Sequence, residues 1–233
     1  MVRQVHSLPW PAGCPGCFSA WRCSLAQWWL AGSGAWPTVS PRSAPPMKRP
    51  LLVLDLDETL IYASESPLDR SADFVVAPYH VYERPGVGDF IAHVSRHFSL
   101  GVWSSSSPAY AAAICGHLFG CGDRLEFVWA SDRCTPTRDL VNDSWSQSKR
   151  LAKLKRRGFR LERVLMVDDS PEKHTKNYGN LVLVRPFEGD LSDQELPLLA
   201  VYLESLAEVP NVRAVEKRRW REYALRQLSS GAD

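Results

Sequence analysis

Short, uninterrupted apolar runs recur along the chain from residue 50 onward, and helical patterns separate them. The apolar runs, which predict strands, cover residues 51–55, 100–104, 126–130, 163–169 and 181–184. The helical patterns cover residues 87–96, 108–119, 149–157 and 171–177, followed by 192–207 and 212–228. Strands that are apolar at every position indicate a sheet covered on both faces. The pattern therefore predicts an α/β fold of three layers with a central parallel sheet.

Residues 61–84 interrupt this alternation. Three short stretches, "IYAS", "DFVVA" and "YHVYERP", are typical of antiparallel strands. They predict a small β insertion directly after the first strand of the sheet. Ligands bind at the carboxyl ends of the strands in open α/β sheets, so an insertion at this place is expected to form a lid over the site.

The first 46 residues differ in composition from the rest. They contain no Asp or Glu, but five of the nine Trp and seven of the 17 Pro. We expect residues 1–46 to be a disordered leader, with Met47 as an alternative start, and residues 47–233 to form the folded domain. Cys14, Cys17 and Cys23 are interpreted as unpaired cysteines, because their spacing is not that of a four-ligand zinc site.

Charge and hydropathy exclude several classes of protein. A formal net charge of +2 argues against a dedicated nucleic-acid binder. No apolar run reaches the length of a membrane span, and proline residues interrupt the start of the chain, so neither a membrane protein nor a secretory signal is predicted. The cysteines of the main domain are interpreted as reduced core thiols. We therefore expect a cytoplasmic protein, or a nuclear one if the source is eukaryotic.

Two pairs of carboxylates end two of the predicted strands. Asp55 and Asp57 follow the first apolar run, and Asp168 and Asp169 close the run at 163–169. Parallel strands bring both pairs to one edge of the sheet, where the carboxylates repel each other unless a cation neutralises them. Oxygen-only ligands favour Mg²⁺ over zinc, so these four residues predict a magnesium site.

The motifs of the chain occur in a recognisable order. They are "DLDETL", "ERPGVGDF", "VWSSSSPAYA", "KRLAKL" and "VLMVDDSPEKHTKNYGN". In this order they resemble the small C-terminal-domain phosphatases and the nuclear-LIM-interactor-interacting-factor-like proteins of the haloacid-dehalogenase-like superfamily. The resemblance covers about residues 50–205 and implies a Rossmann-like fold and a Mg²⁺-dependent phosphatase.

The resemblance also implies the catalytic roles. Asp55 is expected to attack phosphorus and form an aspartyl-phosphate. Asp57 is expected to protonate the leaving oxygen and then to activate water, with Mg²⁺ held by Asp55, Asp57 and a carboxylate of Asp168 or Asp169.

Further residues are expected to bind the phosphoryl group. Ser104 matches the family's hydroxyl at the end of the second strand, and Ser105 remains as an alternative in the serine run. Thr59 is expected to brace the loop beside the phosphate. Lys149 matches the lysine that balances the phosphoryl charge, and Lys153 is the second candidate.

The resemblance implies phosphoserine or phosphothreonine in a protein or peptide as the substrate. Two alternatives stay open, a phosphatase for small metabolites and a phosphoprotein-binding module of weak activity. A separate pair, His93 and His97, has the i, i+4 spacing of metal ligands. No acidic residue lies between the two histidines, so the pair is interpreted as part of a solvated helix face.

Overall fold

The centre of the fold is a five-stranded parallel sheet. The computed structural model describes residues 49–120, 124–139 and 144–230, so the expected leader at 1–46 lies outside the described residues. Each predicted apolar run forms a strand of this sheet. In spatial order the strands are β10 (Leu181–Leu183), β9 (Val164–Asp168), β1 (Leu51–Leu54), β5 (Ser99–Trp103) and β6 (Leu125–Trp129).

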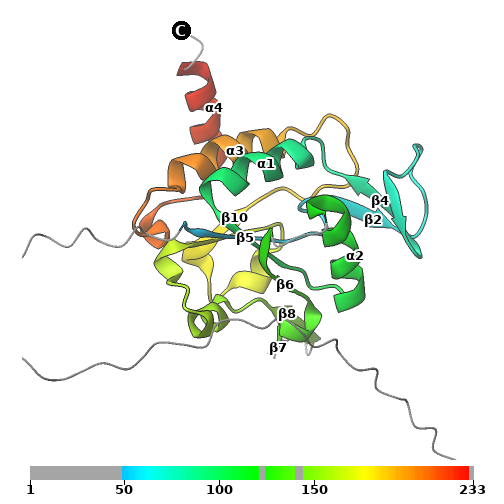
Figure 1. Cartoon of the computed structure of the whole chain (residues 1–233), viewed down its shortest axis with the longest axis horizontal. Coiled ribbons are helices and arrows are strands. Elements are labelled where there is room, and N and C mark those ends of the chain that lie inside the picture. The colour runs from blue at the N-terminus through cyan, green and yellow to red at the C-terminus, as the bar shows by residue number, and fades with distance from the viewer. Residues whose placement is uncertain (1–48, 121–123, 140–143, 231–233) are drawn as a thin grey trace, which may run out of the picture. The chain divides into compact units, whose positions relative to one another are not determined.

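Alternate residues of the central strands enter two separate cores. Leu52 and Leu54 pack into a larger core with the α-helices, whereas Leu51 and Val53 pack into a smaller one on the opposite face. This alternation explains why β1 is apolar throughout. Figure 1 shows α1 and α3 side by side over one face of the sheet. The α-helices are α1 (Val87–His97), α2 (Pro108–Phe119), α3 (Glu195–Leu206) and α4 (Trp220–Ser230).

The opposite face is covered by 3₁₀-helices, where an α-helix was predicted at 149–157. The observed helix η2 spans Leu151–Arg157, and its buried residues Leu151 and Leu154 are three positions apart. This spacing fits the three-residue repeat of a 3₁₀-helix. The predicted helix at 171–177 is likewise the shorter 3₁₀-helix η4 (Pro171–His174). The other 3₁₀-helices are η1 (Ser131–Arg133), η3 (Leu161–Arg163), η5 (Tyr178–Asn180) and η6 (Val212–Ala214).

The β insertion is a three-stranded antiparallel sheet. Its strands β2 (Ile61–Ser64), β4 (Tyr79–Glu83) and β3 (Phe74–Val76) lie in that spatial order, within the range predicted from the sequence. Together with the parallel sheet and its two covered faces, this confirms the predicted three-layer α/β fold with an insertion after the first strand.

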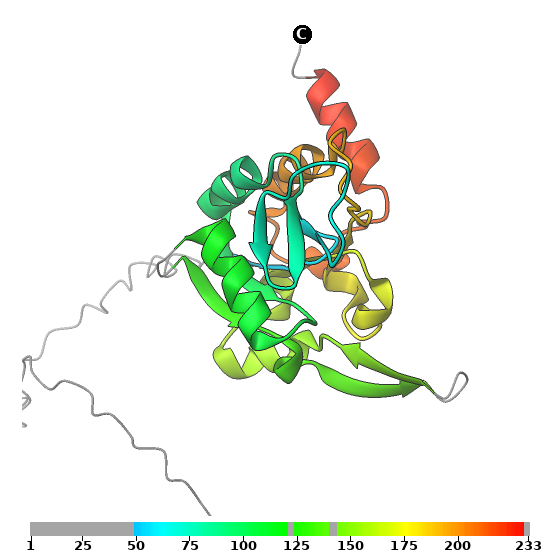
Figure 2. The same ribbon diagram turned by 90° about the vertical axis from the view of Figure 1, so that its right-hand side faces the viewer.

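A β-hairpin between β6 and η2 was not predicted. It pairs β7 (Thr135–Asp139) with β8 (Ser144–Ser148) and projects away from the central sheet (Figure 2). Its strands alternate Thr, Ser and charged residues without an apolar run, and Trp145 is exposed. The sequence therefore lacked the hydrophobic signal on which strand prediction depends.

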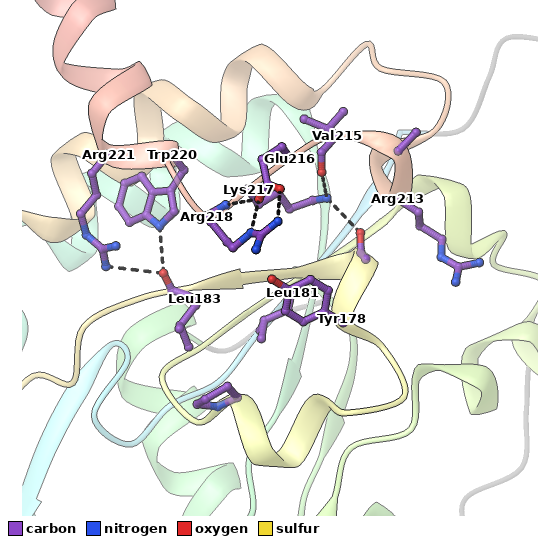
Figure 3. A pocket seen from close by; sticks show the side chains of 13 residues that line it. Tyr178, Leu181, Leu183, Arg213, Val215, Glu216, Lys217, Arg218, Trp220 and Arg221 are labelled. Carbon is purple, nitrogen blue, oxygen red and sulfur yellow. Dashed lines mark hydrogen bonds and ion pairs between the residues drawn. The ribbon is translucent and has the colours of Figure 1, made fainter.

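The predicted helix at 212–228 is interrupted. The chain forms η6, then a turn, and only then α4. In the turn, the ammonium of Lys217 donates to the backbone carbonyls of Gly179, Val212 and Val215 (Figure 3). Trp220 Nε1 donates to the carbonyl of Leu183 at 2.8 Å, so this segment covers part of the outer edge of β10.

Arg84 connects three segments around the first strand. The side chain of Arg84 is fully buried. The guanidinium forms a two-pronged ion pair with Asp193, at 2.9 and 2.7 Å, and also donates to the carbonyls of Thr59 and Arg185. It therefore joins the loop after β1 to the chain that leads into α3.

We expect Arg84→Ala to lower the free energy of unfolding by about 3–5 kcal/mol, because it leaves Asp193 and two carbonyls without their partner. Urea denaturation followed by circular dichroism measures this loss. The matched control is Arg226→Ala, which removes an exposed arginine paired with Glu222 at 4.0 Å and should leave the denaturation midpoint unchanged. Equal effects of the two substitutions would contradict the role assigned to Arg84.

Candidate active site

Three carboxylates meet at the carboxyl edge of the parallel sheet. Leu54 of β1 is in register with Val167 of β9, so Asp55 and Asp168 follow at the same level of neighbouring strands. Asp169 is the next residue. Oxygens of Asp55, Asp168 and Asp169 lie within 4.8 Å of one another. The side chain of Asp57, the fourth residue of the predicted magnesium site, is not part of this cluster.

Lys149 lies between two of these carboxylates. Its Nζ is 2.7 Å from Asp55 Oδ1 and 2.6 Å from Asp168 Oδ2, and its side chain is fully buried. Burial alone would lower the pKa of Lys149, but the charges of Asp55 and Asp168 outweigh it and raise the pKa. The lysine is therefore held as a cation. Asn177 fixes its backbone by donating to the Lys149 carbonyl.

Lys153, the alternative lysine, lies elsewhere. Its ammonium donates to the carbonyl of Arg133 at 2.5 Å and makes no contact with Asp55 or Asp168 among the described residues. The geometry thus brings Lys149 to the carboxylates and leaves Lys153 away from them.

The two aspartates that end β9 have different environments. Asp168 Oδ2 also contacts His174 Nε2 at 2.8 Å, and Asp168 Oδ1 accepts the amide of Ser170. Burial alone would raise the pKa of Asp168, but Lys149 and His174 hold it well below its usual value. Asp169 is only half-buried. Burial and the charge of Asp168 raise the pKa of Asp169, and Thr59 Oγ1 approaches it no closer than 3.5 Å.

Asp55 carries the strongest electrostatic conflict of the site. Burial raises its pKa well above the ordinary value, and the neighbouring charge of Asp168 raises it further. The charges of Lys149 and Lys173 act in the opposite direction. An added cation at this edge would relieve the conflict in the same way.

Asp57 is held by hydroxyl groups from the segment that leads into α2. Tyr110 OH donates to Asp57 Oδ1 at 2.7 Å, and Ser106 Oγ donates to Oδ2 at 2.7 Å. Ser104 Oγ also donates to Oδ2, at 3.3 Å. Burial, followed by the charge of Asp57, raises the pKa of Tyr110, so the phenol remains a donor.

The serines that follow β5 have different environments. Ser104 is fully buried, and its Oγ accepts the amide of Ser106 at 2.9 Å. Ser105 lines the open pocket, and its Oγ has no hydrogen bond of acceptable geometry among the described residues, with the Cys134 thiol nearby. Of the two predicted serines, Ser105 is the one that lines the pocket, although its Oγ is shielded from solvent.

A pocket of about 470 Å³ opens beside these residues. The insertion contributes Ala63 and Tyr79 to its wall, and the loop before α2 contributes serines. Five residues predicted from the sequence do not line it, namely Thr59, Ser104, Lys149, Asp168 and Asp169. The predicted residues that line the pocket are Asp55, Asp57 and Ser105.

Two charged residues of the pocket were not predicted. Glu58 has a left-handed backbone with φ of 55°, which turns the chain sharply after Asp57. Burial, together with the charges of Asp57 and Asp169, raises the pKa of Glu58 to about 7. Lys173, from η4, also lines the pocket.

The hydrogen-bonding residues Ser106, Tyr110 and His174 were also not predicted as site residues. Ser106 and Tyr110 are four positions apart at the start of α2, a spacing that could have drawn attention to a shared face. His174 follows the acidic pair by five to six residues, and no sequence rule assigns it to Asp168.

A different pocket, of about 330 Å³, lies between β10 and the segment before α4 (Figure 3). Leu181, Leu183, Lys217 and Trp220 are among the residues that line it. It contains none of the clustered carboxylates, so the chemistry of the chain belongs to the pocket at the carboxyl edge of the sheet.

Comparison with known families agrees with this geometry. The family model described as NLI interacting factor-like phosphatase matches residues 50–213. The chain belongs to this family. The matched range includes the carboxylates, Lys149 and the β insertion.

Relatives of known name support the assignment. The human carboxy-terminal domain RNA polymerase II polypeptide A small phosphatase 1 is 30% identical over 172 residues, covering 70% of this chain and 62% of the relative. The CTD nuclear envelope phosphatase 1 homolog of Drosophila melanogaster is 28% identical, covering 74% of this chain and 73% of the relative. The CTD small phosphatase-like protein 2 of Dictyostelium discoideum is 28% identical, and this chain spans 30% of its length.

The chain thus spans between about a third and two thirds of several curated relatives. A solved structure of Fcp1, an essential RNA polymerase II CTD phosphatase, aligns over 79% of this chain and 54% of its own, with 21% identity and a TM-score of 0.47. No helix among the described residues has the length and apolar character needed to cross a membrane.

We expect Lys149→Met to lower the free energy of unfolding by about 3–5 kcal/mol in metal-free buffer at pH 8, because Asp55 and Asp168 lose their shared cation. The difference in free energy of unfolding between the wild type and Lys149→Met should become smaller toward pH 5. The pKa of Asp55 is already raised in the folded state, so folded protein takes up a proton there while the unfolded chain stays ionised. Stability of the variant therefore rises as the pH falls.

Urea denaturation at both pH values measures the effect. Lys153→Met is the matched control and should change the free energy of unfolding by about 1 kcal/mol or less, since it loses one exposed hydrogen bond. A Lys149 variant as stable as the control at pH 8 would show that the buried ion pairs contribute little.

Proposed function

We propose that this chain is a Mg²⁺-dependent phosphatase that hydrolyses phosphate monoesters through an aspartyl-phosphate on Asp55. The observation that carries the proposal is the cluster of Asp55, Asp168 and Asp169 beside an open pocket, with the buried Lys149 cation behind it. Carboxylates around a buried nucleophile suit phosphoryl transfer, in which positioning and charge neutralisation supply most of the catalysis.

The donor set fits Mg²⁺, since the three clustered ligands are all carboxylate oxygens. We assign Asp55 and Asp169 as the side chains that hold the metal, with the backbone of Asp57 as a further ligand. Asp168 is assigned to position Lys149, because it is buried and contacts Lys149 and His174 at 2.6 and 2.8 Å. Asp169 is half-buried, and among the described residues its oxygens accept only the hydroxyl groups of Thr59 and Ser170, at 3.5 and 3.2 Å. The bound ion would neutralise the carboxylates and the transferring phosphoryl group.

In the first proposed step, a carboxylate oxygen of Asp55 attacks phosphorus. The bond from phosphorus to the substrate oxygen breaks, and Asp57 gives its proton to the leaving oxygen. In the second step, Asp57 takes a proton from water, the resulting hydroxide attacks phosphorus, and the bond to Asp55 breaks. Inorganic phosphate leaves and both aspartates return to their starting states.

The hydroxyl groups around Asp57 support its assignment as the acid and base. Tyr110 and Ser106 hold one oxygen each, which fixes the direction of the carboxyl group toward the pocket. Ser105 is proposed to contact the phosphoryl oxygens, because the residue lines the pocket and its Oγ, which is shielded from solvent, has no hydrogen bond of acceptable geometry among the described residues. Lys149 balances the charge of Asp55 from behind.

Phosphoserine or phosphothreonine in a protein is the proposed substrate class. The family assignment supports it, and relatives are named as phosphatases of a polymerase carboxy-terminal domain. The lid consists of three short strands and contributes only Ala63 and Tyr79 to the wall of the pocket. A lid of this size leaves room for an extended peptide on either side of the phosphorylated residue.

We expect the full chain to release p-nitrophenol from p-nitrophenyl phosphate in the presence of Mg²⁺ and to stop when the metal is chelated. Asp55→Asn should abolish turnover, because an amide is a poor nucleophile. Asp57→Asn should lower kcat by about 10²–10⁴-fold, the usual contribution of a positioned acid and base.

Asp132→Asn, at an exposed aspartate that pairs with Arg133, is the matched control and should retain wild-type activity. Circular dichroism of each variant checks the fold. Turnover that survives in a folded Asp55→Asn variant would rule out the proposed nucleophile.

The substrate class is tested separately with phosphoserine and phosphothreonine peptides against sugar phosphates. We expect kcat/KM to be at least about tenfold higher for the peptides, because contacts outside the phosphate add to transition-state binding. Higher values for sugar phosphates would favour a metabolite phosphatase. Binding of phosphopeptides without release of phosphate would favour the binding module instead.

A further inference from the structure

A cluster of metal-ligating side chains lies outside the proposed active site, between α1 and α3. His93 and His97 are one turn apart on α1, and Glu204 faces them from α3. The two histidines, interpreted from the sequence as part of a solvated helix face, are 27% and 31% exposed and both contact Glu204. The acidic partner comes from a helix more than 100 residues later.

The cluster is separate from the carboxylate site. α1 ends at His97 and β5 begins at Ser99, so this end of α1 lies at the amino edge of the parallel sheet. Asp55 and Asp168 lie at the opposite, carboxyl edge. The two clusters share no residue.

The donor atoms have the spacing of ligands around one ion. His93 Nε2 is 3.1 Å from Glu204 Oε2, His97 Nε2 is 3.9 Å from Glu204 Oε1, and one donor of each residue lies within 4.8 Å of the others. Bonds of about 2.0–2.2 Å at tetrahedral angles place two zinc ligands roughly 3.3 Å apart. The two distances to Glu204, 3.1 and 3.9 Å, lie on either side of this value.

The contact between His93 and Glu204 is not an ordinary hydrogen bond. His93 Nε2 is shielded from solvent and has no hydrogen bond of acceptable geometry, although a carboxylate oxygen is 3.1 Å away. The two atoms are therefore close together without forming a hydrogen bond. Two ligand atoms that bind the same metal ion are arranged in this way, because each is directed at the ion.

We propose that His93, His97 and Glu204 bind Zn²⁺ and join α1 to α3. Two imidazoles and one carboxylate are a donor set that zinc uses in proteins, and imidazole ligands disfavour Mg²⁺ at this position. The side chains are between about a quarter and a half exposed, so water can take the fourth position. The proposal does not depend on the phosphatase activity.

Arg96 competes with metal binding at His93, so its substitution gives a further test of the zinc site. Its guanidinium lies 3.0 Å from His93 Nδ1 in the structure. When Nε2 binds zinc, Nδ1 carries the proton and can no longer accept a hydrogen bond, so the exposed Arg96 side chain has to turn away. Arg96→Ala removes both this competition and one nearby positive charge. It should therefore tighten zinc binding.

The test is isothermal titration of the full chain with Zn²⁺ in the presence of excess Mg²⁺, which occupies the carboxylate site. All samples carry Cys14→Ser, Cys17→Ser and Cys23→Ser, so that the leader offers no thiolate ligands. We expect one zinc ion per chain, and a thermal midpoint that rises with zinc concentration because only the folded state holds the site. Once Mg²⁺ saturates the carboxylate site, further Mg²⁺ without zinc should leave this midpoint unchanged.

His97→Ala and Glu204→Gln should each weaken zinc binding by about tenfold or more, since one of three ligands is lost. Arg96→Ala should strengthen it, and none of the three should change turnover of p-nitrophenyl phosphate. His97→Asn, a polar substitute, replaces His97→Ala if circular dichroism shows that the alanine variant is unfolded. Zinc affinity that is absent, or that is equal in the wild-type chain and the ligand variants, overturns the proposal.

Discussion

The ion pairs of Lys149 are the constraint on which the site depends. Its ammonium neutralises Asp55 and Asp168, which stand at the same level of adjacent parallel strands and are both buried. Without a cation there, the sheet could not end on these two carboxylates in a solvent-free position. The same charge acts to lower the pKa of the proposed nucleophile, against the burial that raises it. The side chain of Lys149 therefore contributes both to the stability of this sheet edge and to the electrostatics of the proposed nucleophile.

Several segments distant in the sequence hold this edge of the sheet in place. Arg84 ties the loop after β1 to Asp193, and the amide of Phe187 donates to the carbonyl of Glu58 at 2.7 Å. Lys149 itself is fixed through Asn177, from the turn after η4. The pocket is thus assembled from a rigid core, while the lid adds only two residues to its wall. Such a division suits a site whose substrate is large and whose chemistry needs fixed distances.

The two proposed metal sites differ in the way their donors are supplied. Asp55 and Asp169 come from strand ends, where the parallel sheet forces carboxylates together. His93 and Glu204 come from two packed helices, where the distance depends on how α1 and α3 pack. The oxygen-only set selects a hard cation, and the set with imidazole nitrogen selects a softer one. The two sites are therefore proposed to prefer different ions.

The sequence by itself determined the central strands, the insertion after β1 and the convergence of the acidic pairs, because apolar runs and strand ends are local signals. It did not determine whether Lys149 or Lys153 reaches Asp55, nor whether Ser104 or Ser105 faces the pocket. Those choices depend on side-chain direction in the folded state. The partners of Asp57, the burial of Arg84 and the approach of Glu204 to His93 were decided only by tertiary packing, since each joins elements that are far apart in the chain.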